Sequence, residues 1–524
     1  MGKKKNYYIT TAIVYASRKP HIGNDYEIIL ADSLARFKRL DGYRVRFQTG
    51  TDEHGLKIQN NALAAGLDPQ TYVDELAKYI KETYDQLNIS YDHFIRTTDE
   101  SHVAAVGAIF SKLLKNNDIY LSKYDGWYSI REEAFIKEED LIDGKTKEGE
   151  IPIWMSEESY FLNVKKYQAR LLEYIKKHED FIEPEVRKNE MINSFFNKPI
   201  SDLSITRTKL NWGVKLPFDE KHTSYVWIDA LSNYITGLGY HPQKPHQALM
   251  RDFWPANIQV IGKDILRFHT IYWPILLLAL GLELPKKIFG HPWILMNNDK
   301  MSKSWGNVLY SRDLIKYFGV DSVRYYCLHE VPFKDDGNIG YELLMQRVNS
   351  DLTNTVGNLL NRTLGMIAKY QGGVVKKSNI KDPFTTLFNI KKECSNLLPT
   401  MRTFIDKADV AGSLECIIEL ARKGNKYIDL SAPWELFKKG NKKGLINHIL
   451  NILTEVLRYV VVALQPFIPT SAAAMAQQLK LTKFDFASLK RFYSYDTKTF
   501  ELGSPVFVRF EIKEVLKEIE VPLE

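Results

Sequence analysis

The spacing of apolar residues divides the chain into an alternating part and a helical part. From Tyr7 to about Leu113, short apolar runs alternate with amphipathic stretches. This predicts a strand over 7–14, a helix over 27–39, a strand over 44–49 and helices over 69–87. Strands that alternate with helices form parallel sheets covered on both faces. The pattern therefore predicts a doubly wound, Rossmann-like α/β fold.

The alternation is interrupted between about Asp118 and His222. This stretch holds short aromatic strand-like pieces, charge clusters and one amphipathic helix before Pro184, so we interpret it as an inserted domain. Alternation resumes with strands expected at 225–229 and 258–264. The insert therefore splits the sheet.

After about Gln346 the chain is predicted to be almost wholly helical. Apolar residues recur at intervals of three and four in two long stretches, which indicates consecutive amphipathic helices packed as a bundle. The residues that carry this pattern are Val348, Leu352, Val356, Leu359, Leu360, Leu364 and Ile367, and then Leu445, Ile449, Leu453, Val456, Val460 and Leu464.

Composition limits the class of protein. The chain has 524 residues, of which 44% are hydrophobic and 26% charged, as in ordinary globular proteins of three or four domains. Its net charge of +7 suits a polyanionic partner without requiring one. Three isolated cysteines favour neither a disulfide framework nor a cysteine-rich zinc site. The apolar run at 271–282 is too short to span a bilayer, and the basic start lacks a leader pattern, so a cytoplasmic location is expected.

Two short motifs far apart in sequence point to a nucleotide site. His21-Ile22-Gly23-Asn24 follows the first expected strand, so backbone N–H groups and the imidazole are predicted to face a phosphate at a helix start. Lys300-Met301-Ser302-Lys303-Ser304 places two ammonium groups and two hydroxyls on one loop. Such groups stabilise the charge of a polyphosphate transition state. Either motif alone could be an ordinary turn or a solvated loop.

Together the motifs resemble the HIGH and KMSKS sequences of class I aminoacyl-tRNA synthetases. The second motif matches fully, whereas Asn24 replaces the final His of the first. Asn24 can donate a hydrogen bond but carries no charge, so it is either a tolerated substitution or a mark of a weakened enzyme. The resemblance implies catalytic roles for His21, Asn24, Lys300 and Lys303, and ATP contacts from Gly23, Glu27, Gly262, Asp264, Met301, Ser302 and Ser304.

Further segments resemble the methionyl-tRNA synthetases in particular. They are Thr49 to Gly55, Tyr225 to Tyr234 and Ile261 to His269. In this resemblance Asp52 accepts the α-ammonium of methionine, although a lone Asp here could equally cap a turn. Aromatic walls suit a polarizable thioether and exclude β-branched rivals. The implied methionine-binding residues are Ile13, Tyr15, Asp52, Trp227, Ala230, Leu231, Tyr234, Phe268 and His269.

The insert and the helical part extend the resemblance. The segment Tyr124 to Ile130 resembles the family without its knuckle cysteines, so no metal site and no structural zinc are expected. The helical part carries Asn358 and Arg362 on one helix face and a Pro433-Trp434 pair. These four residues resemble the anticodon-binding elements of the family, because an aromatic plate with Asn and Arg suits unstacked bases.

The resemblance implies a methionyl-tRNA synthetase. Such an enzyme converts L-methionine and ATP, with Mg²⁺, to methionyl-adenylate, and transfers methionine to tRNA(Met). A weakened tRNA-binding or regulatory relative and another class I synthetase remain alternatives. The predicted domains are a first catalytic half (1–117), a connective insert without zinc knuckles (118–222), a second catalytic half (223–296), the KMSKS and stem-contact region (297–345) and an α-helical anticodon-binding domain (346–524). A monomer without membrane contact is expected.

Overall fold

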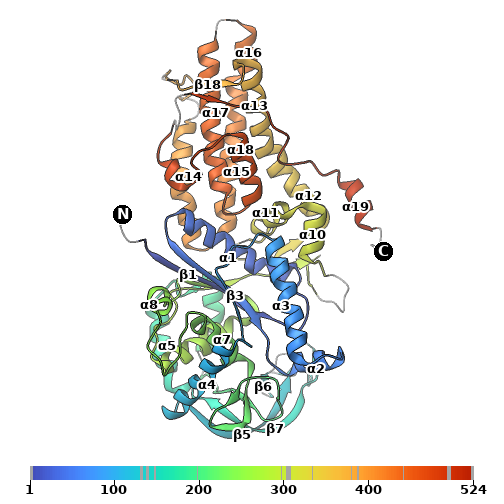
Figure 1. Ribbon diagram of the computed structural model, residues 1–524, viewed down its shortest axis with the longest axis vertical. Coiled ribbons are helices and arrows are strands. Elements are labelled where there is room, and N and C mark those ends of the chain that lie inside the picture. Colours follow the sequence, from blue (N-terminus) through green and yellow to red (C-terminus); the bar gives the residue numbers. More distant parts are fainter. Residues whose placement is uncertain are drawn as a thin grey trace.

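A computed structural model shows an elongated molecule with an α/β region at one end and a helical region at the other (Figure 1). It describes residues 4–129, 134–136, 138, 141–146, 149–197, 199–296, 298–301, 308–332, 334–378, 380–385, 389–440, 442–492 and 497–520. The predicted fold class, a split parallel sheet followed by a helical bundle, is confirmed.

The central sheet has seven parallel strands in the order β2-β3-β1-β13-β14-β8, with β4 also paired to β3. The order runs outward in both directions from the pair β1 and β13. Ligands of doubly wound sheets bind at the carboxyl ends of strands at such a switch point. The strands are β1 (Asn6–Thr11), β2 (Val14–Tyr15), β3 (Arg44–Asp52), β4 (His93–Arg96), β8 (Ile182–Glu183), β13 (Ile258–Gly262) and β14 (Ile288–His291).

Helices cover this sheet, and one of them corrects a sequence prediction. The segment 225–229, expected to be a strand, begins helix α7 instead. A short apolar run cannot distinguish a strand from a buried helix, and here the helical spacing of Trp227, Leu231 and Tyr234 decides. The helices are α1 (Ile22–Leu40), α2 (Leu56–Ala64), α3 (Pro69–Gln86), α4 (Glu100–Lys115), α5 (Lys165–Lys177), α6 (Glu185–Met191), α7 (Val226–Thr236), α8 (Ala248–Phe253) and α9 (Trp273–Leu280).

The insert is built mainly of antiparallel strands. One sheet has the order β6-β5-β7-β9 and a second the order β10-β12-β11. Within the range predicted for the insert, however, β8 pairs in parallel with β14 and so belongs to the central sheet. The insert strands are β5 (Ile119–Ser129), β6 (Ala134–Ile136), β7 (Ile153–Leu162), β9 (Leu203–Ser204), β10 (Thr206–Arg207), β11 (Lys215–Leu216) and β12 (Asp219–Ser224).

A small sheet and three helices connect the two regions. Strand β15 pairs antiparallel with β16 and parallel with β17. Lys300, the first residue of the second motif, therefore lies in the hairpin of β15 and β16. Strand β15 also pairs with β17, which follows the motif in sequence. The elements are β15 (Ile294–Met296), β16 (Asp299–Lys300), β17 (Gly337–Ile339), α10 (Ser311–Phe318), α11 (Val320–Glu330) and α12 (Tyr341–Arg347).

The helical region packs around α17, which is long and apolar. By length and composition α17 could cross a membrane, but 89% of its apolar window is buried inside the protein, as in the core helix of a bundle. Its neighbours include α13 and α15. The helices are α13 (Asn358–Gln371), α14 (Ile390–Asp406), α15 (Val410–Ser431), α16 (Pro433–Lys438), α17 (Lys443–Leu464), α18 (Pro469–Gln478) and α19 (Ile512–Glu520), with β18 (Val374–Lys376) and β19 (Thr497–Thr499) beside them.

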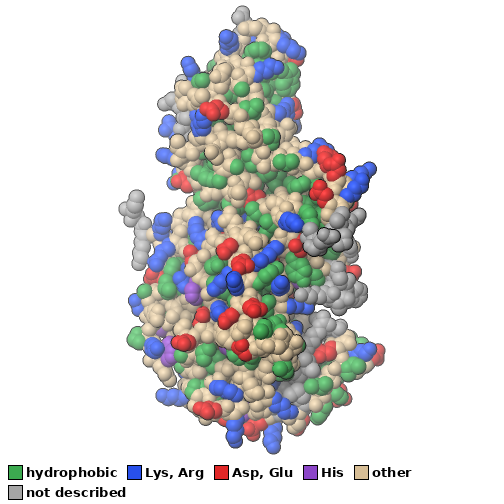
Figure 2. Space-filling view, turned by 45° about the vertical axis from the view of Figure 1, so that its right-hand side comes forward, with side chains coloured by type: hydrophobic (Ala, Val, Ile, Leu, Met, Phe, Trp, Pro, Cys, Tyr) green, Lys and Arg blue, Asp and Glu red, His purple; other side chains and the backbone are tan. Residues whose placement is uncertain are grey.

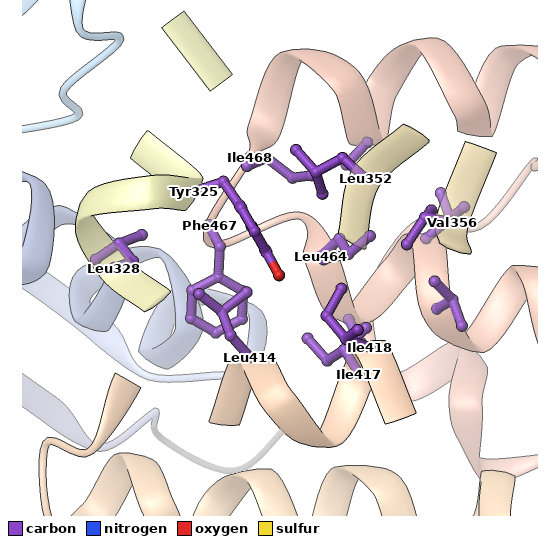
Figure 3. Close-up of a cluster of buried hydrophobic side chains, with 14 of the residues drawn as sticks. Tyr325, Leu328, Leu352, Val356, Leu414, Ile417, Ile418, Leu464, Phe467 and Ile468 are labelled. Atoms are coloured by element: carbon purple, nitrogen blue, oxygen red, sulfur yellow. The ribbon is translucent and has the colours of Figure 1, made fainter. Parts of the chain in front are cut away.

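One continuous hydrophobic core joins the two regions. Side chains of α11, such as Tyr325 and Leu328, pack with Leu414 of α15 and with Leu464 and Phe467 at the end of α17 (Figure 3). The same cluster includes residues of α1. The bundle and the α/β region therefore share one hydrophobic core.

A buried ion pair lies where these two regions meet. Arg324 on α11 and Asp32 on α1 are both 0% exposed, and Arg324 Nη2 donates to Asp32 Oδ2 at 2.7 Å. Arg324 also donates to the carbonyls of Leu87 and Phe467, at 3.1 and 2.9 Å. Burial is the largest single influence on the pKa of Asp32 and raises it, but the Arg324 and Arg36 guanidiniums and the hydrogen bonds from Ser90 together hold this pKa below its usual value. One side chain thus links the α/β region to the bundle.

Candidate functional site

The first motif forms a capped helix start. His21 is the N-cap of α1, where its Nδ1 accepts from the Gly23 N–H at 3.1 Å. In return, Asn24 Oδ1 accepts from the His21 N–H at 3.2 Å, which completes a capping box. Because Nδ1 is the acceptor, the neutral imidazole carries its proton on Nε2 and can act there as a donor.

The two sequence motifs meet through Met301. This residue is 4% exposed, and a Cβ placed on Gly23 would lie 3.1 Å from Met301 Cε and 2.9 Å from His21 Cε1. Gly23 is therefore the residue that lets both side chains approach α1. On the far side of the second motif, Leu309 O accepts from the Ile22 N–H at 2.9 Å, and Ser311 donates to the buried Asp25.

These contacts correct one expectation. The first N–H groups of α1 do not face an open phosphate site: Ile22 donates to Leu309 O, Gly23 to the His21 ring, and Asn24 and Asp25 to His21 O at 2.8 and 3.1 Å. The cap satisfies the donors that a helix start leaves unpaired. Of the predicted phosphate ligands, the backbone of Lys300 pairs with Leu295 in the hairpin, whereas Ser302, Lys303 and Ser304 lie outside the described residues.

Glu27 lies at the switch point of the sheet and is held by the protein. Its Oε1 accepts from the Ala12 N–H at 2.6 Å, and its Oε2 lies 3.0 Å from His291 Nε2. Burial raises the pKa of Glu27, and the hydrogen bond with His291 partly offsets this. The predicted ATP residue Glu27 thus fixes the ends of β1 and β14 relative to α1.

Gly262 and Asp264 border the same edge. A Cβ on Gly262 would lie 2.5 Å from Asp264 Oδ1, so glycine lets the Asp264 carboxylate lie close to the end of β13. The carboxylate of Asp264 is exposed and accepts from Trp293 Nε1 at 3.3 Å. The neighbouring Lys263 is engaged elsewhere, since its Nζ lies 2.7 Å from both carboxylate oxygens of Asp336.

Aromatic rings from α7 and from the segment after β13, both predicted to contact methionine, lie against each other. Trp227 and Phe268 are stacked, with ring centroids 3.5 Å apart and planes at 6°. Both are half-buried. Sequence reasoning proposed these two residues for one pocket, and the structure brings them into direct contact.

Tyr234 and His269 form a buried neutral pair behind these rings. They are 1% and 2% exposed, and the Tyr234 hydroxyl lies 2.7 Å from His269 Nε2. His269 Nδ1 lies 3.1 Å from Ile265 O, which requires the proton on Nδ1 and makes Nε2 the acceptor. Burial lowers the pKa of His269 from 6.5 to about 4, so the ring is uncharged at neutral pH.

The remaining predicted methionine residues surround the carboxyl end of β3. Tyr15 of β2 pairs with Asp52 of β3, and Asp52 is 6% exposed. Ile13 packs against the small cluster that contains Ala230. Leu231, one position further along α7, packs into a second, larger hydrophobic cluster of the α/β region. Ala230 thus faces the segment between β1 and β2 that carries Ile13, and Leu231 anchors α7.

The predicted anticodon residues lie in the helical region. Asn358, the first residue of α13, is exposed, and Arg362 one turn later pairs with Asp429 of α15 at 2.8 Å. Pro433 is the first residue of α16, as predicted, and Trp434 packs half-buried against the core. Ala432 between α15 and α16 has φ +39°, a strained conformation for a residue with a Cβ.

Comparisons with known proteins identify the family. The family model described as "tRNA synthetases class I (M)" matches residues 7–146 and 136–364, and the "Anticodon binding domain of methionyl tRNA ligase" matches residues 388–499. A "Methionine--tRNA ligase" of Clostridium perfringens is 47% identical over 99% of this chain and 80% of that protein. The chain belongs to the methionyl-tRNA synthetase family.

The solved structures agree with the family. The methionyl-tRNA synthetase of Mycobacterium tuberculosis, in complex with methionyl-adenylate, has a TM-score of 0.92 and 39% identity, covering 96% of this chain and all of that chain. Its free form has a TM-score of 0.85. A second curated relative, from Clostridium acetobutylicum, is 46% identical over 99% of this chain and 80% of that protein. As a member of this family, the chain is a class I aminoacyl-tRNA synthetase, an ATP-dependent ligase.

Sequence reasoning missed one buried cluster, which involves α7, the helix that carries Trp227 and Tyr234. Asp229 of α7 is 0% exposed, and its two oxygens lie 2.7 Å from His54 Nδ1 and 2.8 Å from His102 Nε2. The pKa of Asp229 is held below its usual value; burial is the largest influence and acts upward, but the two histidines outweigh it. His54 and Asp229 lie within the segments that carry Asp52 and Trp227, yet only the fold shows that they bond.

Within the described ranges, no group of three or more His, Cys, Asp or Glu side chains is placed to hold a metal ion. The three cysteines are free thiols, two buried and one half-buried. The insert without zinc stays a prediction.

Proposed function

We propose that this chain activates L-methionine with ATP to form methionyl-adenylate, and then esterifies the terminal adenosine of tRNA(Met) with release of AMP. The observation that carries the proposal is the meeting of Gly23, His21 and Met301 at the start of α1. It brings the two nucleotide motifs within contact distance of the sheet edge where doubly wound folds bind ligands.

The side-chain pocket selects methionine by shape and polarity. Trp227 and Phe268 offer flat, polarizable surfaces to the thioether. Tyr234 and His269 satisfy each other and carry no charge, so an apolar side chain meets no unpaired polar group. Asp52, at the end of β3, accepts the α-ammonium group. Ile13, Tyr15 and Ala230 complete the walls, and Leu231 supports α7 from the core side.

The phosphates are stabilised by two sources of positive potential. His21 donates from Nε2, and Lys300 and Lys303 contribute ammonium groups, with Ser302 and Ser304 as hydroxyl donors. ATP enters as its Mg²⁺ complex, and the metal leaves with pyrophosphate. Gly23, Gly262 and Asp264 border the nucleoside, while Glu27 and Asn24 fix the strand ends and the helix start. No protein nucleophile is required, because the methionine carboxylate attacks the α-phosphorus itself.

Recognition of tRNA(Met) takes place at the helical end. Trp434 offers a stacking surface, and Asn358 and Arg362 offer hydrogen bonds to base edges. Pro433 begins α16 and fixes the position of Trp434. We also propose a monomer in the cytoplasm without structural zinc; gel filtration and metal analysis test these points.

Lys303→Ala tests the assigned chemistry. We expect methionine-dependent pyrophosphate exchange to fall by about 10²–10³, because one group that stabilises developing charge is lost. Methionine binding, measured by equilibrium dialysis, should stay within about twofold. Lys316→Ala, an exposed lysine on α10, is the matched control. Loss of methionine binding in Lys303→Ala would contradict the assigned role, and stronger exchange with another amino acid would contradict the substrate.

A further inference from the structure

A pocket of about 700 Å³ lies beside the two motifs, on the side of α3. Its walls come from the loop that precedes His21, from one face of α3 and from residues 310–313, which follow the second motif. None of the residues that line it belongs to the predicted ATP, methionine or anticodon sets. The pocket therefore has no role in the function described so far.

The protein fixes the walls of this pocket before any ligand enters. Tyr72 Oη and Asn61 Nδ2 both donate to Ser17 O, at 2.7 and 2.8 Å, which holds the loop that carries Arg18 and Lys19. On the opposite side, Arg312 donates to Thr83 Oγ1 at 2.8 Å and to Tyr79 O at 2.6 Å.

Cations and an aromatic ring are interleaved inside it. The guanidinium carbon of Arg312 lies 3.8 Å from the ring centroid of Tyr79, and Lys19 Nζ lies 4.8 Å from the same centroid. Arg18 and Lys19 are exposed at the mouth. The face shown in Figure 2 carries basic and acidic side chains side by side, and the pocket itself is lined by acidic as well as basic residues.

This chemistry fits single-stranded nucleotides. Aromatic and guanidinium planes stack bases, and exposed Arg and Lys contact phosphates. Two exposed carboxylates, Glu75 and Asp313, also line the pocket. They can accept from the amino groups of cytosine or adenine, whereas they would repel free pyrophosphate, the other polyanion of the reaction.

The position of the pocket indicates which nucleotides of the tRNA it binds. Lys19 precedes His21 by two residues, which places their Cα atoms within about 7 Å. A strand bound here lies beside the site where methionyl-adenylate forms. We propose that the pocket binds the single-stranded 3′-terminal nucleotides of the tRNA and guides the terminal adenosine to the adenylate. This inference rests on the proposed function.

The double variant Arg18→Ala/Lys19→Ala tests the proposal without altering a buried residue. Removing two phosphate contacts should raise the KM for tRNA about tenfold and reduce the slope of log KM against log salt by about 1.4, while pyrophosphate exchange stays unchanged. The matched control is Lys115→Ala/Lys176→Ala, which removes two exposed charges from α4 and α5. It should change neither quantity.

A tRNA(Met) that lacks its last three nucleotides locates the contact. If the pocket binds the 3′ end, wild type and double variant bind this truncated tRNA equally, and only intact tRNA distinguishes them. A defect that persists with truncated tRNA, or no defect at all, would overturn the proposal. A raised KM for pyrophosphate in the exchange assay would also overturn it and assign the pocket to pyrophosphate.

The ring of Tyr79 gives a second, independent measurement. Tyr79→Leu should lower kcat/KM for tRNA by ~5–150-fold, the loss expected for one stacked base, whereas Tyr79→Phe keeps the ring and should retain most activity. Unchanged exchange in Tyr79→Leu shows that the variant has folded; equal charging by Tyr79→Leu and wild type would contradict the stacking. Failure of wild-type exchange with methionine would instead refute the proposed function.

Discussion

The α/β region and the helical region present their candidate binding residues in opposite ways. In the α/β region, Asp229, His269 and Tyr234 are at most 2% exposed; Tyr234 bonds to His269, and Asp229 bonds to His54 and His102. In the helical region, Asn358 is exposed and Trp434 half-buried, above a core of mainly aliphatic residues. A small amino acid can be enclosed by preorganised polar groups, whereas a macromolecule must be read from the surface. Polar side chains are therefore buried where the ligand is a small amino acid and exposed where it is a macromolecule.

The largest effect should come from breaking the joint between the two regions. Arg324→Met removes one partner of a buried ion pair and should destabilise the protein by about 3–5 kcal/mol. Thermal unfolding followed by circular dichroism and by tryptophan fluorescence should shift together. Arg36→Met is the control, because Arg36 pairs with the same Asp32 from a side chain that is 21% exposed, and it should cost less than about 1 kcal/mol. Unfolding of one region only would show that the regions are not coupled.

The buried pair of the α/β region should make stability depend on pH. The pKa of His269 is lowered from 6.5 to about 4, so the unfolded state binds more protons between these values. Stability is therefore lost as the pH falls from about 6.5 to about 4, by up to ~3 kcal/mol.

His269→Gln checks this expectation, because the variant should lack most of that pH dependence in urea unfolding. The exposed His246→Gln is the control and should behave as wild type. Equal pH profiles for wild type and His269→Gln would show that the imidazole is not buried in its neutral form.

A substitution at the surface of the helical region should affect tRNA charging alone. Trp434→Ala removes a stacking surface and should reduce kcat/KM for tRNA(Met) by an amount equivalent to about 1–3 kcal/mol. Pyrophosphate exchange should not change, because the ring is remote from the α/β region. Phe437→Ala is a control on the same short helix, with a side chain that is exposed. A parallel loss of exchange would mean that Trp434 supports the fold and does not contact RNA.

The smallest effect concerns Asn24. Asn24→Ala removes the acceptor of the capping box and should cost about 0.5–1 kcal/mol of stability, measured by thermal unfolding. Asn24→His should leave pyrophosphate exchange within tenfold of wild type, because the position serves the helix start. A gain larger than tenfold would support the reading of a weakened enzyme.

Most of the fold follows from local patterns. The alternation of apolar runs predicted β1, α1 and β3, but β1 ends at Thr11, α1 begins at Ile22 and β3 extends to Asp52; the helical stripe of 445–464 became α17. The segment 225–229 was misassigned because a short apolar run fits a strand and a buried helix equally. The place of β8 in the central sheet was also missed, since two residues carry no periodicity.

The sequence by itself determined the family, because the two nucleotide motifs and the segments around Asp52, Trp227 and His269 are contiguous strings. Only the tertiary structure decided how these strings meet. The contact of Met301 with Gly23, the clamp of Asp229 by two histidines and the ion pair of Asp32 with Arg324 each join residues from distant segments. These contacts exist only when the segments that carry them have packed together, and no local spacing encodes them.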